Sequence, residues 1–217
     1  FGLSFTYNKP ALVVISERLL NTFILMGTSL FLSFGFGIIG GAVLAWRRGT
    51  LFETLSTMAV LVVRCAPAFW TGMLLLSLFA FRLGWLPLGG VSPAGMQFSS
   101  SFERYFSITF LKHLTLPALT AALYSCAAPM LVMRSSMLEI IKEDFVELCR
   151  AKGIGEKKIL FKHAVRNALI PVVTLFAVVA GSAIGGIVLI ETVFRWPGMG
   201  REIVLAINNR DYPVAQA

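Results

Sequence analysis

Long apolar stretches separated by clusters of charged residues run along most of the chain. Residues 19–46, 113–133 and 167–190 contain no Asp, Glu, Lys or Arg, and residues 54–81 are interrupted by a charge only at Arg64. A charge at the centre of a bilayer costs about 2.5 to 3.5 kcal/mol, and a helix of about 20 apolar residues crosses the hydrocarbon core. The pattern therefore predicts four membrane-spanning helices. Strands of a membrane barrel are excluded because apolar residues do not alternate with polar ones.

The composition agrees with this pattern. Hydrophobic residues make up 57% of the chain and charged residues 14%, whereas soluble domains have about 45 to 50% apolar and about 25% charged residues. We expect an all-α, polytopic membrane helix bundle whose surrounding solvent is the lipid bilayer. The net charge of +8 does not indicate nucleic acid binding, because the basic residues lie in the gaps between apolar runs and not along one exposed face.

The basic residues set the orientation of the predicted spans. Eight Lys and Arg residues lie between positions 134 and 166, so the positive-inside rule places this segment in the cytoplasm. Arg47 and Arg48 lie two spans away and fall on the same side. The resulting division of the chain is an outer segment (1–18), transmembrane helices (19–138) with an outer loop (82–112), a cytoplasmic loop (139–168), a transmembrane helix (169–190) and an outer amphipathic segment (191–217).

Glycine and proline are frequent inside the predicted spans. Gly37 with Gly41, and Gly181 with Gly185, form GxxxG patterns, which permit close approach of helices in lipid. Glycine is also common in membrane helices without such a role. Prolines that remove a helical hydrogen bond and kink a span are expected to act at four positions, Pro67, Pro117, Pro129 and Pro171.

The predicted cytoplasmic loop contains two short helical patterns. The first runs from Phe145 to Gly153, with acidic residues early, basic residues late, and a glycine that ends it. The second starts at Gly155 and runs back into the membrane. This arrangement favours a compact cytoplasmic projection. The alternative is an amphipathic loop that lies on anionic lipid.

Five stretches of the chain, in order, carry a family resemblance. They are residues 65–70 (CAPAFW), 82–87 (RLGWLP), 143–173 (EDFVELCRAKGIGEKKILFKHAVRNALIPVV), 191–200 (ETVFRWPGMG) and 209–213 (NRDYP). The chain resembles permeases of ATP-binding cassette (ABC) importers of the dipeptide, oligopeptide and nickel type. The resemblance implies a type I ABC importer permease fold in the bacterial plasma (inner) membrane. It also implies six spans, four of them visible here, with one expected before Phe1 and one after Ala217.

The same resemblance implies partners and contact residues. The expected partners are a homologous second permease subunit, two cytoplasmic ATPase subunits that bind ATP and Mg, and an extracytoplasmic solute-binding protein. In the family's Glu-Ala-Ala loop motif, Glu147 and Gly153 match the first half, whereas Val165-Arg166 replaces the later Leu-Pro. The residues expected to contact the ATPase are Phe145, Glu147, Leu148, Arg150, Ala151, Lys152 and Gly153.

No chemistry of its own is predicted for the chain, and no cofactor in it. It lacks the phosphate-binding motif GxxxxGK[ST]. An intramembrane enzyme would need paired acids, a Ser/His pair or metal ligands at membrane depth, and the two histidines, His113 and His163, have no such neighbours in sequence. We therefore predict no metal site and a peptide substrate. Nickel or a metal chelate is the alternative, and a stand-alone channel or secondary transporter is the alternative of another class.

Two further groups of residues are candidates for contact with substrate or partner. Arg64 lies about 16 Å along the helix axis from Glu53, near mid-membrane, and with Pro67 it is assigned to the translocation path, where it would attract carboxylates. If the helix is shifted, Arg64 instead extends to the cytoplasmic interface. On the outer side, Ile203 and Ile207 share one face of a predicted helix, Arg201 to Asn208. Together with Trp196 they are assigned to an outer gate or to a binding-protein contact.

Overall fold

The computed structural model describes the chain except for residues 1, 94, 97 and 99 and the side chains of residues 101 and 182–186. The described chain is helical, and an isolated β-bridge joins Leu3 to Pro10. The helices are α1 (Ala11–Trp46), α2 (Leu51–Cys65), α3 (Ala68–Leu75), the π-helix η1 (Leu76–Arg82), α4 (Ser101–Tyr105), α5 (Ile108–Ser125), α6 (Ala127–Ile140), α7 (Asp144–Ala151), α8 (Glu156–Lys158), the π-helix η2 (Ile159–Ala164), α9 (Val165–Gly186), α10 (Val188–Val193), α11 (Met199–Asn208) and α12 (Tyr212–Ala215).

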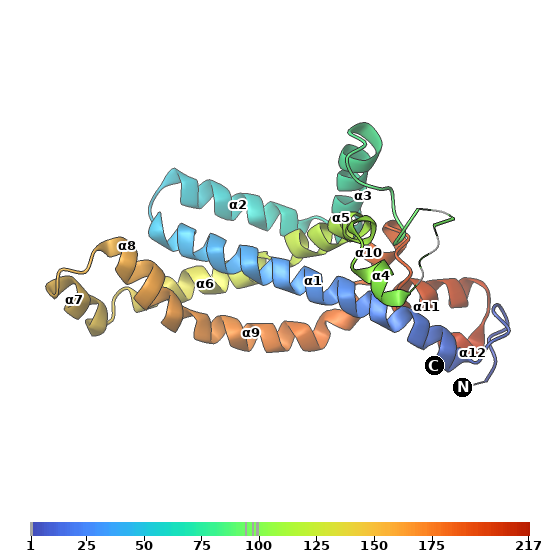
Figure 1. The fold of residues 1–217 in the computed structure, drawn as a ribbon. Helices are drawn as coiled ribbons and strands as arrows, with labels where there is room; N and C mark the ends of the chain where they lie inside the picture. Colours follow the sequence, from blue (N-terminus) through green and yellow to red (C-terminus); the bar gives the residue numbers. More distant parts are fainter. Residues whose placement is uncertain (1, 94, 97, 99) are drawn as a thin grey trace. The chain divides into compact units, whose positions relative to one another are not determined.

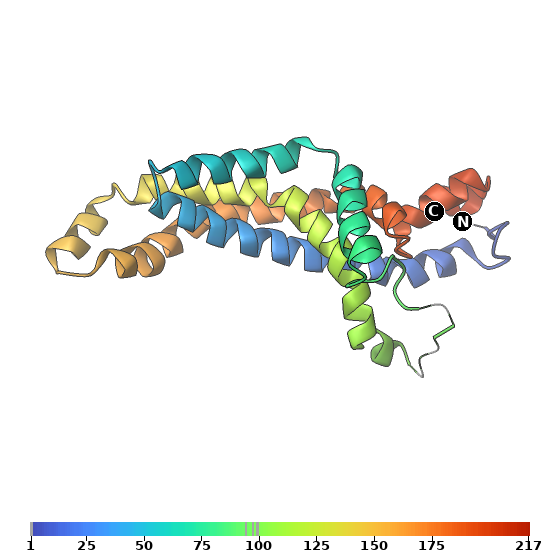
Figure 2. The same ribbon diagram turned by 90° about the horizontal axis from the view of Figure 1, so that it is seen from above.

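The chain forms two compact units. The first contains Phe1–Ser29, Pro67–Ala121 and Ala183–Ala217, and the second contains Leu30–Ala66 and Ala122–Ser182. In the second unit, the later part of α1 runs beside α2, α6 and α9, and α7 lies at one end of this bundle (Figures 1 and 2). The expected all-α bundle is therefore confirmed for the described residues.

Glycines let α1 and α6 approach closely in the second unit. A Cβ atom built on Gly37 would lie 2.7 Å from Cγ of Pro129, and one on Gly41 would lie 2.5 Å from the carbonyl oxygen of Met130. The packing role predicted for the first GxxxG pattern is confirmed. For the second pattern, no other part of the described chain lies within 4 Å of a Cβ built on Gly181, and Gly185 falls outside the described side chains.

The span predicted at residues 54–81 is not one continuous helix. It is broken at Ala66 and Pro67, which both adopt extended backbone conformations between α2 and α3. Proline has no amide hydrogen and disfavours the helical conformation of the residue before it, so the helix ends there. The prolines at 117 and 171 lie inside α5 and α9, and Pro129 follows the break between α5 and α6.

By length and composition, two helices in the described residues can each cross a membrane. They are α1 and the helix from Glu156 to Gly181, and up to four spans result if the bent pairs, α2 with α3–η1 and α5 with α6, each count as one. α1 begins at Ala11, inside the predicted outer segment of residues 1–18. The length of the uncharged stretch does not predict this first part of α1, because a helix can extend beyond the hydrocarbon core, where its charged side chains are in water.

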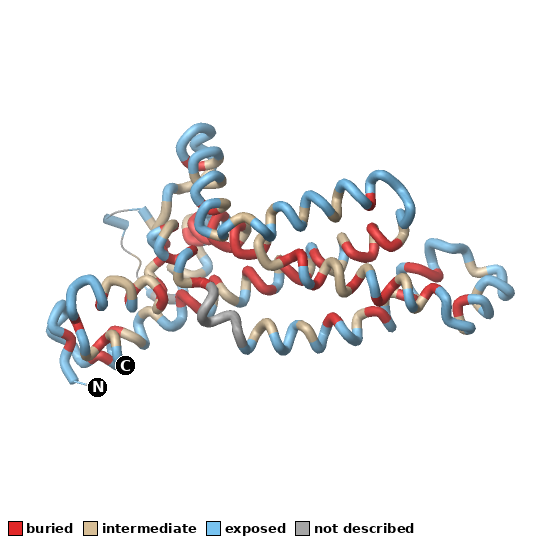
Figure 3. Tube along the Cα trace, turned by 180° about the vertical axis from the view of Figure 1, so that it is seen from behind, coloured by how far each residue is buried: buried red, intermediate tan, exposed pale blue. Residues whose placement is uncertain are grey.

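The first unit has its own apolar core. Its fully or nearly buried members come from η1, α5, α10 and the residue that caps the end of α10, namely Ala80, Leu116, Ala121, Ile190 and Phe194. Gly72 of α3 packs on this core, since its Cβ would lie 3.2 Å from the ring of Phe194. Figure 3 shows the buried positions within each unit and the exposed ones around them.

Candidate functional site

The α7 helix brings the predicted ATPase-contact residues together at one end of the second unit. Val146 is fully buried and fixes the helix to the unit, whereas Leu148 is 56% exposed although it is a large apolar residue. Phe145 is half-buried. The remaining members of the predicted set are exposed, namely Glu147, Arg150, Ala151, Lys152 and Gly153. The helix therefore has one anchored side and one side available to a partner.

The end of α7 is a glycine-dependent cap. Gly153 has φ +73°, a left-handed conformation that favours glycine. Its amide donates to the carbonyl of Arg150 at 2.9 Å, and the amide of Ile154 donates to the carbonyl of Cys149 at 3.1 Å. This is the Schellman arrangement, which satisfies the last carbonyl groups of a helix. The sequence prediction that Gly153 ends the helix is confirmed.

Arg150 has a partner that the sequence analysis did not assign to it. Its Nε donates to Oε1 of Glu156 at 2.7 Å, so the ion pair closes the loop between α7 and α8. The two residues line an open pocket of about 240 Å³ together with residues from the end of α1 and from η2. Nearby, the rings of Trp46 and Phe161 stack with centroids 5.5 Å apart. The stacked rings thus hold η2 against the end of α1.

A partly buried ion pair joins α2 to α6. Nε of Arg134 donates to Oε1 of Glu53 at 2.6 Å, and the other carboxylate oxygen accepts from the amide of Gly49. Glu53 also occupies the third position of α2, where the hydroxyl of Thr50 caps its amide. The Thr-x-x-Glu spacing predicts this cap, but nothing local in the sequence identifies Arg134 as the partner. In the sequence, Arg134 is only one of the eight basic residues at positions 134–166.

Arg64 lies in the last turn of α2, one turn before Pro67. Its guanidinium carbon lies 4.6 Å from the centroid of the Tyr124 ring, and Nη1 donates to the carbonyl oxygen of Tyr124 at 3.4 Å. A cation at a helix C-terminus is also stabilised by the helix dipole. The backbone carbonyl that binds Arg64 therefore belongs to the end of α5. Both Arg64 and Pro67 are exposed.

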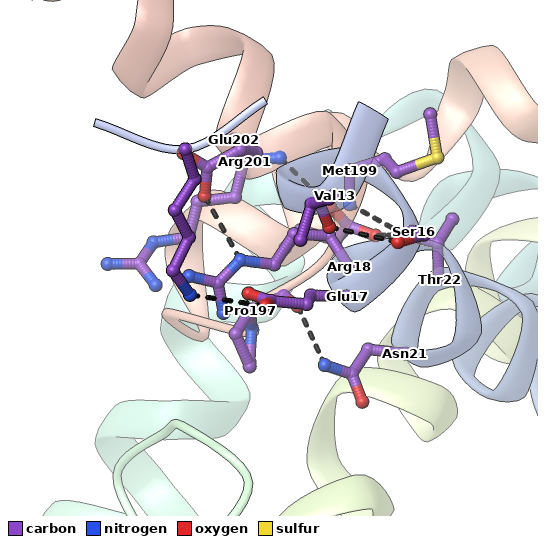
Figure 4. Close-up of polar contacts among 12 residues, drawn as sticks. Val13, Ser16, Glu17, Arg18, Asn21, Thr22, Pro197, Met199, Arg201 and Glu202 are labelled. Carbon is purple, nitrogen blue, oxygen red and sulfur yellow. Dashed lines mark hydrogen bonds and ion pairs between the residues drawn. The ribbon is translucent and has the colours of Figure 1, made fainter. Parts of the chain in front are cut away.

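A polar cluster in the first unit joins α1 to α11 and to the segment before it. Asn21 donates to the carbonyl of Pro197 at 2.8 Å, the hydroxyl of Thr22 accepts from the amide of Met199, and Arg18 pairs with Glu202 at 3.3 Å (Figure 4). The same region contains Trp196, whose Nε1 donates to the carbonyl of Asn21 at 3.0 Å. Trp196 is fully buried, so its side chain offers no surface to a partner in the chain itself, and its assignment to an outer gate or a binding-protein contact stays a prediction.

Glu191 is a buried acid that organises this cluster. Its Oε1 accepts from the hydroxyl of Thr22 at 2.7 Å, and its Oε2 accepts from the amide of Arg201 at 2.9 Å. Gly198, at the N-cap of α11, supplies no side chain, so the carboxylate of Glu191 stabilises the exposed amide groups at the start of the helix. The sequence showed an acid near a span end but not this capping role.

The amphipathic helix expected at Arg201 to Asn208 is confirmed as α11, which begins two residues earlier. The residues of α11 that pack against the rest of the first unit are not its large apolar ones. Gly200, Glu202 and Ala206 face the first unit and are buried, whereas Ile203 and Ile207 are 40% and 62% exposed. The two isoleucines therefore remain available to a partner, as their assignment requires.

The N-terminal segment is attached to the end of α11. The carboxylate of Asp211 accepts hydrogen bonds from the hydroxyl of Ser4 and from the amides of Phe5 and Thr6. Burial raises the pKa of Asp211, but these hydrogen bonds outweigh it and leave the pKa below its usual value. In the part of the chain that the structure describes, no three His, Cys, Asp or Glu side chains come together as a metal site requires.

The sequence is similar to known transport proteins. The family model described as "Binding-protein-dependent transport system inner membrane component" matches residues 37–217. Over its whole length the chain is 37% identical to the dipeptide transport system permease protein DppB of Alkalihalophilus pseudofirmus, 37% identical to the oligopeptide transport system permease protein AppB of Bacillus subtilis, and 36% identical to the glutathione transport system permease protein GsiC of Escherichia coli. It spans 68%, 67% and 65% of these relatives, respectively.

The family match covers most of the chain, including α7, Arg64 and α11, and the relatives exceed one third identity across all of it. The chain belongs to the family of binding-protein-dependent transport system inner membrane components.

Proposed function

We propose that the chain is the membrane-spanning permease subunit of an ATP-driven importer and forms part of the path through which peptides cross the bacterial inner membrane. The names of the relatives support this substrate class, since they specify dipeptides, oligopeptides and glutathione. A homologous second permease subunit would complete the path. A solute-binding protein would deliver the peptide from outside.

The observation that carries this proposal is the geometry of α7. Val146 attaches the helix to the second unit, and Leu148 with its charged neighbours stays accessible. An exposed leucine on a short, capped helix suits insertion into an apolar groove on another protein. We assign this role to a cytoplasmic ATPase, so that ATP and Mg are bound by two such partner subunits and hydrolysis takes place there.

Arg64 and Pro67 are assigned to the translocation path. A charged side chain within an apolar, membrane-spanning stretch does not face lipid, because the cost of burying its charge there is too high. Arg64 is nevertheless exposed in the chain itself. A water-filled path bounded by the companion permease satisfies both conditions, and a guanidinium there would bind the carboxylate of a peptide.

The test of the coupling role is the substitution Leu148→Glu in the assembled transporter. It should lower co-purification of the ATPase subunits at least tenfold and abolish ATP hydrolysis stimulated by the binding protein. The matched control is Leu51→Glu, since Leu51 is an 81% exposed leucine at the first turn of α2. Full assembly and full stimulated hydrolysis in the Leu148→Glu transporter would refute the coupling role of α7.

A further inference from the structure

A basic pocket lies beside α7, on the helical run that returns to the membrane. Its volume is about 500 Å³, and the lining residues are Phe145, Lys162, His163, Arg166 and Asn167. Three of the five side chains are basic types, one is an amide donor, and none is acidic. Asp144 and Glu147 of α7 are exposed and do not line the pocket. The pocket thus has the chemistry of an anion site.

The pocket continues into an apolar surface along the same helix. Lys162, Arg166 and Ile170 follow one another at intervals of four residues, and Val173 comes one turn later, so all four lie on one helical face. Ile170 is 67% exposed and Val173 is 64% exposed. No charged residue follows Arg166 before Glu191. One face therefore changes from basic to apolar at the point where the uncharged stretch of α9 begins.

This change matches the two parts of an anionic phospholipid. The basic residues fit a phosphate group at the cytoplasmic membrane surface, and the exposed aliphatic side chains fit an acyl chain. A free phosphate would use the pocket alone, and an acidic surface of a partner protein would not need the apolar stretch below it.

We propose that Lys162, His163, Arg166 and Asn167 form a binding site for the phosphate of an anionic phospholipid, with its acyl chain along Ile170 and Val173. The proposal goes beyond the assignment of α7 to an ATPase. It requires only that this end of α9 lies at the cytoplasmic surface of the membrane, where the basic segment already places it.

The test measures phosphatidylglycerol binding to the full-length protein in its complex, by native mass spectrometry during lipid titration. Removal of two charges in Lys162→Gln/Arg166→Gln should weaken binding by about thirtyfold. The matched control is Lys157→Gln/Lys158→Gln, which removes the same charge from exposed positions of α8 outside the pocket. The exchange Lys162→Arg/Arg166→Lys keeps the charge and should keep binding, which separates charge from a folding defect.

Other sources of the anion predict different results in this experiment. Millimolar inorganic phosphate should not displace the lipid, and phosphatidylcholine should not bind at the pocket. Displacement by phosphate at that concentration would show a free phosphate site and overturn the proposal. Equal lipid affinity in both glutamine variants would overturn the proposal. It would also be overturned if Lys162→Gln/Arg166→Gln lost the ATPase subunits while its lipid affinity stayed unchanged. Lipid affinity is measured without transport, so the result can be interpreted even if the proposed import function is wrong.

Discussion

Arg134 and Glu53 connect α6 to α2 within the second unit through a hydrogen-bonded ion pair, and α6 leads directly into the segment that carries α7. Removing one partner leaves the other charge without its counterpart in a largely buried place, since the side chain of Glu53 is 9% exposed. Glu53→Gln should lower the free energy of unfolding by about 1 to 3 kcal/mol, with the lower end favoured because Arg134 is partly exposed. Thermal unfolding in detergent measures this change.

The double variant Glu53→Gln/Arg134→Gln provides the control for this pair. Its destabilisation should be smaller than the sum of the two single changes, because each single change already breaks the same contact. Additive effects would mean that the two side chains do not stabilise the fold through each other.

Gly153→Ala should weaken the end of α7. The left-handed backbone at Gly153 disfavours any side chain, at a cost of about 1 kcal/mol, so the helix end should fray and coupled ATP hydrolysis should fall. Gly155→Ala is the control, because Gly155 has φ −64° and open space around a built Cβ. Equal hydrolysis by the two variants would contradict a role for the cap.

Arg64→Glu should abolish peptide uptake while the transporter still assembles, because it reverses the charge offered to a peptide carboxylate. Tyr124→Phe keeps the aromatic ring under the guanidinium and should transport normally, whereas Tyr124→Leu removes the ring and should reduce uptake. Uptake by reconstituted transporter in liposomes measures these effects. Unchanged uptake by an assembled Arg64→Glu transporter would exclude Arg64 from the path.

Attachment of the N-terminal segment should depend on pH through Asp211. Because the folded pKa lies below the usual value, the stabilisation is fully present above the pKa of an unfolded aspartate, about 3.9, and is lost as the pH falls through the folded pKa. Protection of the amides of Phe5 and Thr6 against hydrogen exchange, relative to the intrinsic rate at each pH, should therefore be lost only under strongly acidic conditions. In Asp211→Ala this protection should be absent already at neutral pH, so that exchange is fast. Slow exchange in that variant would contradict the attachment.

Cysteine labelling can test which face of α11 is free. Ile203→Cys and Ile207→Cys should react with a water-soluble maleimide, whereas Ala206→Cys, at a position only 4% exposed, should stay protected. If α11 borders an outer vestibule that opens and closes, labelling of the two exposed positions should change with the nucleotide state of the transporter. Constant labelling in every state would indicate that α11 does not move with the cycle.

The fold was predictable wherever hydropathy or a single residue decides it. Uncharged stretches located the two helices that are long and apolar enough to cross a membrane and the two bent helix pairs that can each count as one span. Gly153 located the end of α7, and the first GxxxG pattern located the close packing of α1 on α6. Helix ends outside the membrane were not predictable from charges, as the start of α1 at Ala11 shows. The break at Pro67 was predicted only as a kink, because sequence does not tell how far the chain unwinds before the next helix begins.

The site was less predictable, because its main contacts join residues distant in sequence. Glu53 contacts Arg134, and Thr22 contacts Glu191, although the two members of each pair are far apart in the sequence. Neither pair has a spacing that is typical of a motif. The burial of Trp196 was not predictable for the same reason. It results from tertiary packing on Phe110 and the hydrogen bond to Asn21, which lie far from it in the sequence.

The capping of α11 by Glu191 has a consequence for how relatives of this chain can vary. A Cβ atom on Gly198 would collide with the carboxylate of Glu191, and one on Gly200 would lie 2.8 Å from Cα of Val188. Positions 191, 198 and 200 are therefore constrained as a set. In an alignment of family members they should change together or not at all, with a shorter residue at 191 wherever a side chain appears at 198.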